Sequence, residues 1–127
     1  MSNLVTGSGN GYGGLYSNVF DLFTFIKAVL VEKTLLNSKS LAIMQTSGKE
    51  DDPNYYGYGI QKTFLNHGGD YGIGHKGRDL GYTANLFYFP SKGIIQVLFV
   101  NYGTDSKSNL QQVFYDFQEE LLNTTLN

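Results

Sequence analysis

The sequence contains no cysteine, no tryptophan, two prolines and a single arginine among its 127 residues. Without cysteine, the chain forms neither disulfides nor thiolate metal sites. A formal net charge of -2 and one arginine leave no basic stripe for phosphates, so neither a nucleic acid nor an anionic membrane is expected as a partner. No apolar run reaches the roughly 20 residues of a membrane span, and no signal peptide is recognisable.

Apolar and aromatic residues, by contrast, are plentiful. They make up 41% and 15% of the chain, which argues against disorder and for one domain with a real core. The ten tyrosines and nine phenylalanines fall mostly where strands or helix faces are expected, so we assign them to the core and not to a stacking platform for ligands. Residues 1–14 hold five glycines and are expected to be a flexible lead-in to a domain over residues 15–127.

Three segments have the apolar periodicity of helices. The first is predicted from a cap at Ser17 or Asn18 to about Glu32, and a shorter one over about residues 37–48. A last helix is predicted from about Ser106 and should lie across the sheet. Its expected apolar face consists of Leu110, Val113, Phe114, Phe117 and Leu121, and its expected wet positions are Gln111, Gln112, Asp116 and Glu119.

Strand-forming residues dominate from Tyr55 onward, after an acidic loop at residues 50–54. The intervening loops are short, which makes antiparallel neighbours the default. The predicted fold class is therefore α+β: an antiparallel four-strand meander, with two N-terminal helices and one C-terminal helix packed on the sheet. The strands are expected near Tyr56–Leu65, Tyr71–Arg78, Tyr82–Phe89 and Ile94–Asn101.

The stretch from Gly74 to Tyr82 is the strongest candidate for a functional site. Gly77 lacks a Cβ where a substrate backbone could approach, and the backbone N–H of Arg78 can donate to developing negative charge. His75 would serve there as a cation or a proton relay. On spacing alone, however, an exposed strand histidine with an ordinary hydrogen bond explains His75 better.

A nucleophile to face this stretch is missing from the sequence. No lysine of the chain has a serine three residues before it, so the chain has no Ser-x-x-Lys motif.

The order and spacing of several motifs resemble the C-terminal part of the serine β-lactamase and penicillin-binding-protein family, which includes class C β-lactamases, DD-peptidases, D-amino-acid amidases and related esterases. The resemblance runs from about Gly13 to Asn101. It rests on Gly13-Gly14-Leu15-Tyr16-Ser17, Asp21-Leu22, Leu35-Leu36-Asn37-Ser38, Met44, Gly74-His75-x-Gly77, Gly81-Tyr82-Thr83-Ala84, Pro90 and Asn101.

This resemblance implies a partial β-lactamase-like fold and a role for each residue of the His-x-Gly strand. His75 would be the catalytic cation or proton relay, and the Arg78 N–H would share the oxyanion hole with the nucleophile's own N–H. Gly77 and Lys76 would contact substrate, although Lys76 departs from the family's common hydroxyl. An ammonium there could still bind a substrate carboxylate.

The function implied is that of a fragment of a serine hydrolase that forms an acyl-enzyme on peptidoglycan peptides, β-lactams or esters, without a cofactor. The fragment alone should be inactive. The resemblance places the parent protein in the cell envelope or outside the cytoplasm, whereas the sequence itself gives no location.

Three alternatives remain open. One is a binding module or pseudoenzyme that keeps only the cleft wall, which Lys76 favours. Another is a small hydrolase that uses Ser17, His75 and Asp79. Tyr16-Ser17-Asn18 also has the form of the family's second motif. The position of this tripeptide in the sequence, however, favours Ser17 as a helix cap and Tyr16 as a packing residue. The last is a metal site at His67, Asp70 and His75, which the spacing does not require.

The strand over residues 94–100 is expected to be an edge, because its partner in the family comes from the N-terminal half. It is uncharged and rich in β-branched residues, so a homodimer through this strand is predicted.

Overall fold

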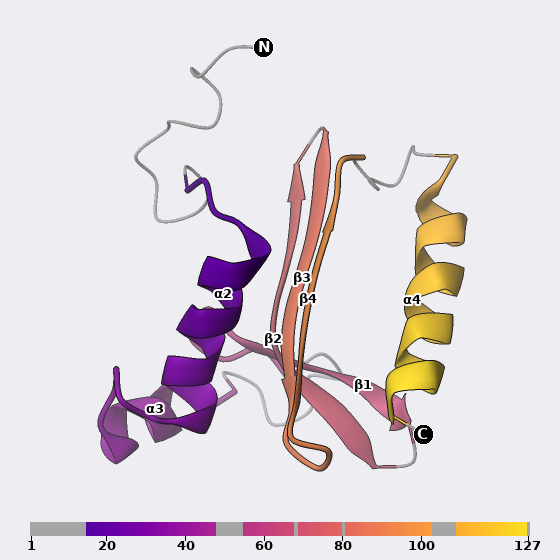
Figure 1. The fold of residues 1–127 in the computed structure, drawn as a ribbon. Coiled ribbons are helices and arrows are strands. Elements are labelled where there is room, and N and C mark those ends of the chain that lie inside the picture. Colours follow the sequence, from indigo (N-terminus) through magenta and orange to yellow (C-terminus); the bar gives the residue numbers. More distant parts are fainter. Residues whose placement is uncertain (1–14, 48–54, 68, 80, 103–108, 127) are drawn as a thin grey trace.

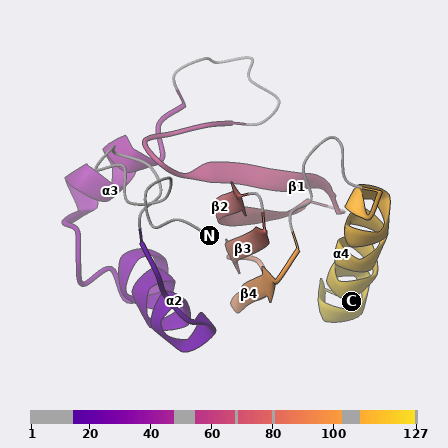
Figure 2. The same ribbon diagram turned by 90° about the horizontal axis from the view of Figure 1, so that it is seen from above.

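The computed structural model describes residues 15–47, 55–67, 69–79, 81–102 and 109–126. Its strands form one antiparallel sheet in the order β1-β2-β3-β4, with two N-terminal helices on one face and the C-terminal helix on the other (Figures 1 and 2). The predicted α+β meander is therefore confirmed. The strands are β1 Gln61–His67, β2 Asp70–Asp79, β3 Tyr82–Phe89 and β4 Ile94–Val100; the helices are α2 Val19–Ile26, η1 Lys27–Val31, α3 Ser38–Met44 and α4 Gln111–Leu126.

Several sequence predictions fall outside the described residues. They are the flexible lead-in at residues 1–14, the acidic loop at residues 50–54, the end of the second helix at Gly48 and the start of the last helix at Ser106.

An asparagine caps each of the first two helices. The Asn18 side chain accepts hydrogen bonds from the backbone of Phe20 and Asp21, both at 2.9 Å, and so satisfies two donors that the helix leaves free. The cap is thus Asn18 and not Ser17. The helix continues to Glu32 as predicted, but its last turn is the π-helix η1, in which the Glu32 N–H donates to Lys27 at 2.9 Å.

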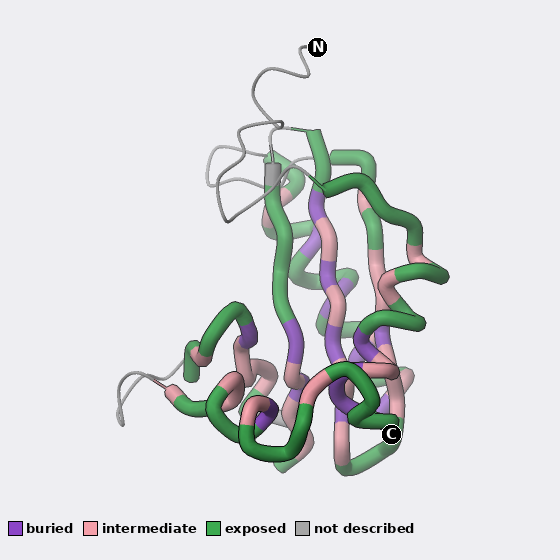
Figure 3. The backbone as a smooth tube through the Cα atoms, turned by 90° about the vertical axis from the view of Figure 1, so that its left-hand side faces the viewer, coloured by how far each residue is buried: buried purple, intermediate pink, exposed green. Residues whose placement is uncertain are grey.

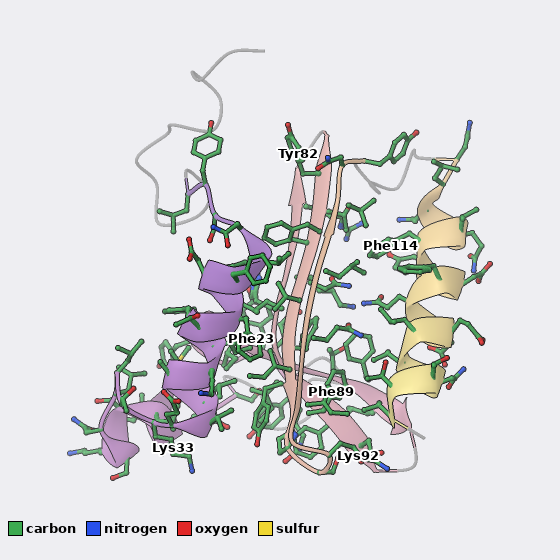
Figure 4. The ribbon with its side chains drawn as sticks, viewed as in Figure 1. Phe23, Lys33, Tyr82, Phe89, Lys92 and Phe114 are labelled. Atoms are coloured by element: carbon green, nitrogen blue, oxygen red, sulfur yellow. The ribbon has the colours of Figure 1, made fainter. Side chains whose placement is uncertain are left out.

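The sheet has a hydrophobic core on each face, because side chains alternate along β3. Ile26, Leu30 and Leu41 from the N-terminal helices pack with Leu86 and Tyr88 on one face. The other core comes from Phe87, Phe89, Leu122 and Leu126, with Phe64 of β1 packed against it. Phe114 and Phe89 both lie in the layer between α4 and the strands (Figure 4).

The predicted apolar face of α4 was wrong in part. Its buried residues are Phe114, Gln118, Leu122 and Leu126, whereas Val113 and Phe117 are 59% and 51% exposed. The apolar arc of this helix is wider than its contact with the sheet, so the helix can rotate about its axis to bring its last two leucines onto Phe87 and Phe89. The exposed part of the arc consists of Leu110, Val113 and Phe117, here called the α4 stripe.

Candidate functional site

Strand β2 is paired on both sides along only part of its length. Its contacts with β1 end at the pair Gln61 and Gly74, whereas its contacts with β3 continue to the pair Asp79 and Tyr82. Residues 75–79, here called the open segment, therefore have a ladder partner on one side only within the described chain. Figure 3 shows residues 75–78 as an exposed stretch beside the alternating burial of β3. An extended ligand could add to the sheet along the side of this segment that faces away from β3.

His75 lies at the start of the open segment and is exposed, as predicted for a residue on an uncovered wall. Its Nε2 is hydrogen-bonded to the hydroxyl of Tyr56, and the two rings meet edge to face with centroids 5.6 Å apart. Sequence reasoning missed Tyr56. The sequence placed Tyr56 at the start of the first strand, and nothing in its spacing indicates a contact 19 residues along the chain.

The four predicted site residues divide between the two faces of the sheet. The register with β3 directs His75 and Gly77 toward the α2 face, and Lys76 and Arg78 toward the α4 face. The backbone of the open segment is where the two faces meet. A ligand that touches both His75 and Lys76 would therefore have to lie along this edge.

Two glycines of β2 differ sharply in the space that the fold leaves for a side chain. A Cβ at Gly74 would lie 1.8 Å from the backbone oxygen of Leu86, so only glycine fits there. A Cβ at Gly77 would meet only the Ala84 side chain, at an ordinary 3.5 Å. The fold requires the first glycine but not the second, and this leaves the close approach of a ligand as a reason for Gly77.

Lys76 is a partly desolvated cation. Its Nζ lies 5.1 Å from the centre of the Phe64 ring. Desolvation by burial, and then the positive charge of Arg78, lower the pKa of Lys76 below its ordinary value. Because the residue as a whole is exposed, the desolvation is incomplete and its energetic cost is small. An ammonium with a lowered pKa and an aromatic neighbour would be stabilised by a bound anion.

We expect Lys76→Gln to raise the free energy of unfolding slightly at neutral pH, by less than about 0.5 kcal/mol. The folded state holds the Lys76 proton less tightly than the unfolded chain, so unfolding takes up protons and the stability of the wild type rises with pH through the window below the ordinary lysine pKa. The urea midpoints of the wild type and Lys76→Gln should differ at neutral pH and become equal at alkaline pH. Lys39→Gln on α3 is the control, and a gap that widens at alkaline pH would contradict the expectation.

Neither Ser17 nor Tyr16 takes the place expected of it. The Ser17 hydroxyl donates weakly to the backbone oxygen of its neighbour Asn18, at 3.4 Å, and does not cap α2. Tyr16 is 82% exposed, so its prediction as a packing residue was wrong. Both precede the first turn of the helix, where a side chain can project into solvent beyond the core.

The described residues contain no group of three histidine, aspartate or glutamate side chains that could hold a metal ion. Asp70 instead accepts a hydrogen bond from Ser91 and lies 3.9 Å from the Lys92 ammonium. The side chains of His67 and Asp79, on which two alternatives depend, lie outside the described part of the chain.

A small pocket of about 120 Å³ lies between Gln45, the residue after α3, and the first two strands, where the Lys62 ammonium lies 3.8 Å from the centre of the Tyr71 ring. Ligand sites usually measure about 300 Å³ or more. The pocket is therefore too small to enclose an acyl substrate, and no residue of the open segment of β2 lines it.

Comparisons with known protein families, curated proteins and solved structures found no match for this chain. None of the helices in the described ranges has the length and apolarity needed to cross a membrane.

Proposed function

We propose that this chain is the C-terminal part of a serine hydrolase of the β-lactamase and penicillin-binding-protein type. The observation that carries the proposal is the open segment of β2, where an exposed His75 and a glycine that the fold does not require lie on the edge of the strand beyond its last described pair with β1. An acyl substrate in extended form would lie along this edge. The Arg78 N–H would stabilise the oxyanion, and His75 would supply a positive charge or relay a proton.

The apolar surface of the molecule supports the same proposal. The α4 stripe and the exposed Phe20 of α2 are large hydrophobic surfaces that a complete enzyme would cover. Strand β4 lies at the end of the sheet order and offers an unpaired edge among the described strands. In the proposed parent, a further segment with the nucleophilic serine would pack against these surfaces.

A second candidate function is a binding module that keeps this wall without turnover. Lys76 favours it, because an ammonium replaces the hydroxyl common at this position of the family, and its lowered pKa indicates a site that an anion would stabilise. Such a module would bind carboxylate compounds along β2 and would never form an acyl-enzyme.

Acylation distinguishes these possibilities. We expect residues 1–127, treated with penicillin-type or phosphonate acylating agents, to show no stoichiometric mass increase by intact mass spectrometry, because the chain has no Ser-x-x-Lys motif. A mass increase that disappears in Ser17→Ala would contradict the fragment proposal and support a site at Ser17.

The coding sequence upstream of Met1 gives the complementary test. A Ser-x-x-Lys motif in that sequence would support the hydrolase, and a protein extended to include it should be acylated, with a loss of acylation rate of about a hundredfold or more in His75→Ala. An upstream sequence without this motif, together with carboxylate binding that Lys76→Gln weakens, would support the binding module.

We also propose that the isolated chain forms a homodimer through β4. Its unpaired edge and its lack of charge support this association.

A further inference from the structure

We propose that Tyr56 is a positioning residue for His75: its phenol donates a hydrogen bond to Nε2 and fixes the neutral imidazole in the tautomer with its proton on Nδ1. The role of His75 in this inference rests on the proposed function. The hydrogen bond between Tyr56 and His75 does not depend on that function. Tyr56 comes from the turn before β1, whereas His75 lies in the open segment of β2.

The direction of the hydrogen bond follows from the chemistry of the two groups. A phenol O–H is a stronger donor than an imidazole N–H, and an imidazole nitrogen is a better acceptor than a phenol oxygen. The pair is therefore best satisfied when Tyr56 donates and Nε2 accepts. A neutral imidazole carries one proton, so that proton must then lie on Nδ1.

The backbone around Tyr56 is held on both sides. Tyr56 forms an isolated antiparallel bridge with Gln61 at the start of β1, and the Tyr55 carbonyl accepts from the Lys62 N–H at 3.1 Å. Tyr55 has a φ of 34°, in the left-handed region that a residue with a bulky side chain seldom adopts. Such a conformation persists only where the surrounding structure enforces it, and it recurs next to functional sites.

The turn is also clamped to the end of α3. The Tyr58 N–H donates to the Met44 carbonyl at 2.9 Å, which satisfies one of the carbonyls left free at a helix C-terminus. A Cβ at Gly57 would lie 2.3 Å from the same oxygen, so the turn approaches α3 as closely as glycine permits. The Gly57 N–H in turn donates to Ile60 at 2.8 Å.

These contacts fix the position of Tyr56 through its backbone, while its own side chain contributes little to the core. Tyr56 is 42% exposed, and its ring reaches across the surface to an exposed His75. A surface contact between two such rings has little effect on stability, but it determines which ring nitrogen is free to act. With Nε2 occupied by the phenol, the Nδ1 hydrogen of His75 is the donor available to a ligand or a second protein group.

The test is the ¹⁵N long-range NMR spectrum of His75 in labelled residues 1–127. The chain has two histidines, so His67→Gln assigns the signals. We expect an unprotonated, hydrogen-bonded Nε2 and a protonated Nδ1 in the wild type. In Tyr56→Phe, the major tautomer of His75 should change from Nδ1–H to Nε2–H, which is the form that a free imidazole prefers. Tyr58→Phe, which alters a tyrosine 71% exposed in the same turn, should leave the tautomer unchanged.

A wild-type His75 in the Nε2–H form, or a tautomer that Tyr56→Phe does not change, would overturn the proposal. Unchanged backbone shifts of β2 in Tyr56→Phe separate loss of positioning from loss of structure. The NMR result does not depend on hydrolase activity. If the His75 tautomer is fixed but the parent has no Ser-x-x-Lys motif, the missing motif refutes the proposed function, whereas the role of Tyr56 stands. In an acylating parent, Tyr56→Phe should lower the acylation rate with little change in KM.

Discussion

Residues 1–127 are expected to sediment as a monomer–dimer mixture whose dimer fraction rises with concentration, because no described strand pairs with the outer edge of β4. The strand Ile94–Val100 carries no charge and no proline, and it is the last strand in the sheet order. Such an edge hydrogen-bonds readily to another copy of itself. Sedimentation velocity at several concentrations measures the association.

The sequence of β4 suits a two-fold axis through its middle residue. In an antiparallel pair centred on Val97, Ile94 would face Val100 of the second copy and Ile95 would face Phe99. Every cross-strand pair would then be apolar except Gln96 with Leu98, and no like charges would meet.

The α4 stripe is a second apolar surface that such a dimer could involve. It is exposed on the helix that covers the face of the sheet with Phe87 and Phe89. Two copies joined at β4 would bring their stripes together over the joined sheet. Figure 2 shows α2 and α4 on either side of the open β4 edge, so both helix layers would flank the seam.

Val97→Lys is the decisive variant, since the two-fold axis would set one ammonium directly opposite another. We expect it to reduce the dimer fraction at least tenfold. Ile43→Lys on α3, at a half-exposed apolar position away from β4, should leave association unchanged. Gln96→Pro would remove a backbone donor, although it also risks unfolding the sheet. A monomer at every concentration, with slowly exchanging amides along residues 94–100, would show that one chain covers its own edge.

Local pattern predicted the strands better than it predicted the side-chain contacts. Strand Tyr82–Phe89 was predicted to the residue, because alternating β-formers lie between Gly81 and Pro90. The first strand was predicted from Tyr56, but it begins at Gln61, since the intervening turn is held against α3 and joins the sheet only through the isolated bridge. Only tertiary packing fixes that turn, and the contact between Tyr56 and His75 depends on it.

The rotation of α4 was beyond sequence reasoning for a different reason. Apolar residues cover more of this helix than one sheet can bury, so several rotations satisfy the pattern equally. Gln118 is buried although its polar side chain predicts exposure, and Val113 is exposed although its apolar side chain predicts burial. In the observed rotation, Leu122 and Leu126 pack on Phe87 and Phe89.

Gly74→Ala is expected to destabilise the fold by about 3 kcal/mol or more, or to prevent folding. The added Cβ would overlap the Leu86 carbonyl oxygen at 1.8 Å, and neither backbone can move without breaking the pairing of β2 with β3. Urea unfolding gives the change in free energy. It should be measured at concentrations where the protein is monomeric, so that dimerisation does not add to the apparent stability.

Gly77→Ala, three residues along the same strand, is the matched comparison. Its Cβ would find ordinary contact with Ala84 at 3.5 Å, so the free energy of unfolding should change by no more than about 0.5 kcal/mol. A stable Gly77→Ala that loses acylation in the extended protein, or carboxylate binding in the module, would show that the missing side chain serves a ligand. Equal destabilisation by the two variants would mean that the sheet requires both glycines. Gly77 would then no longer support a site at the open segment of β2, and only the exposed His75 would remain as support.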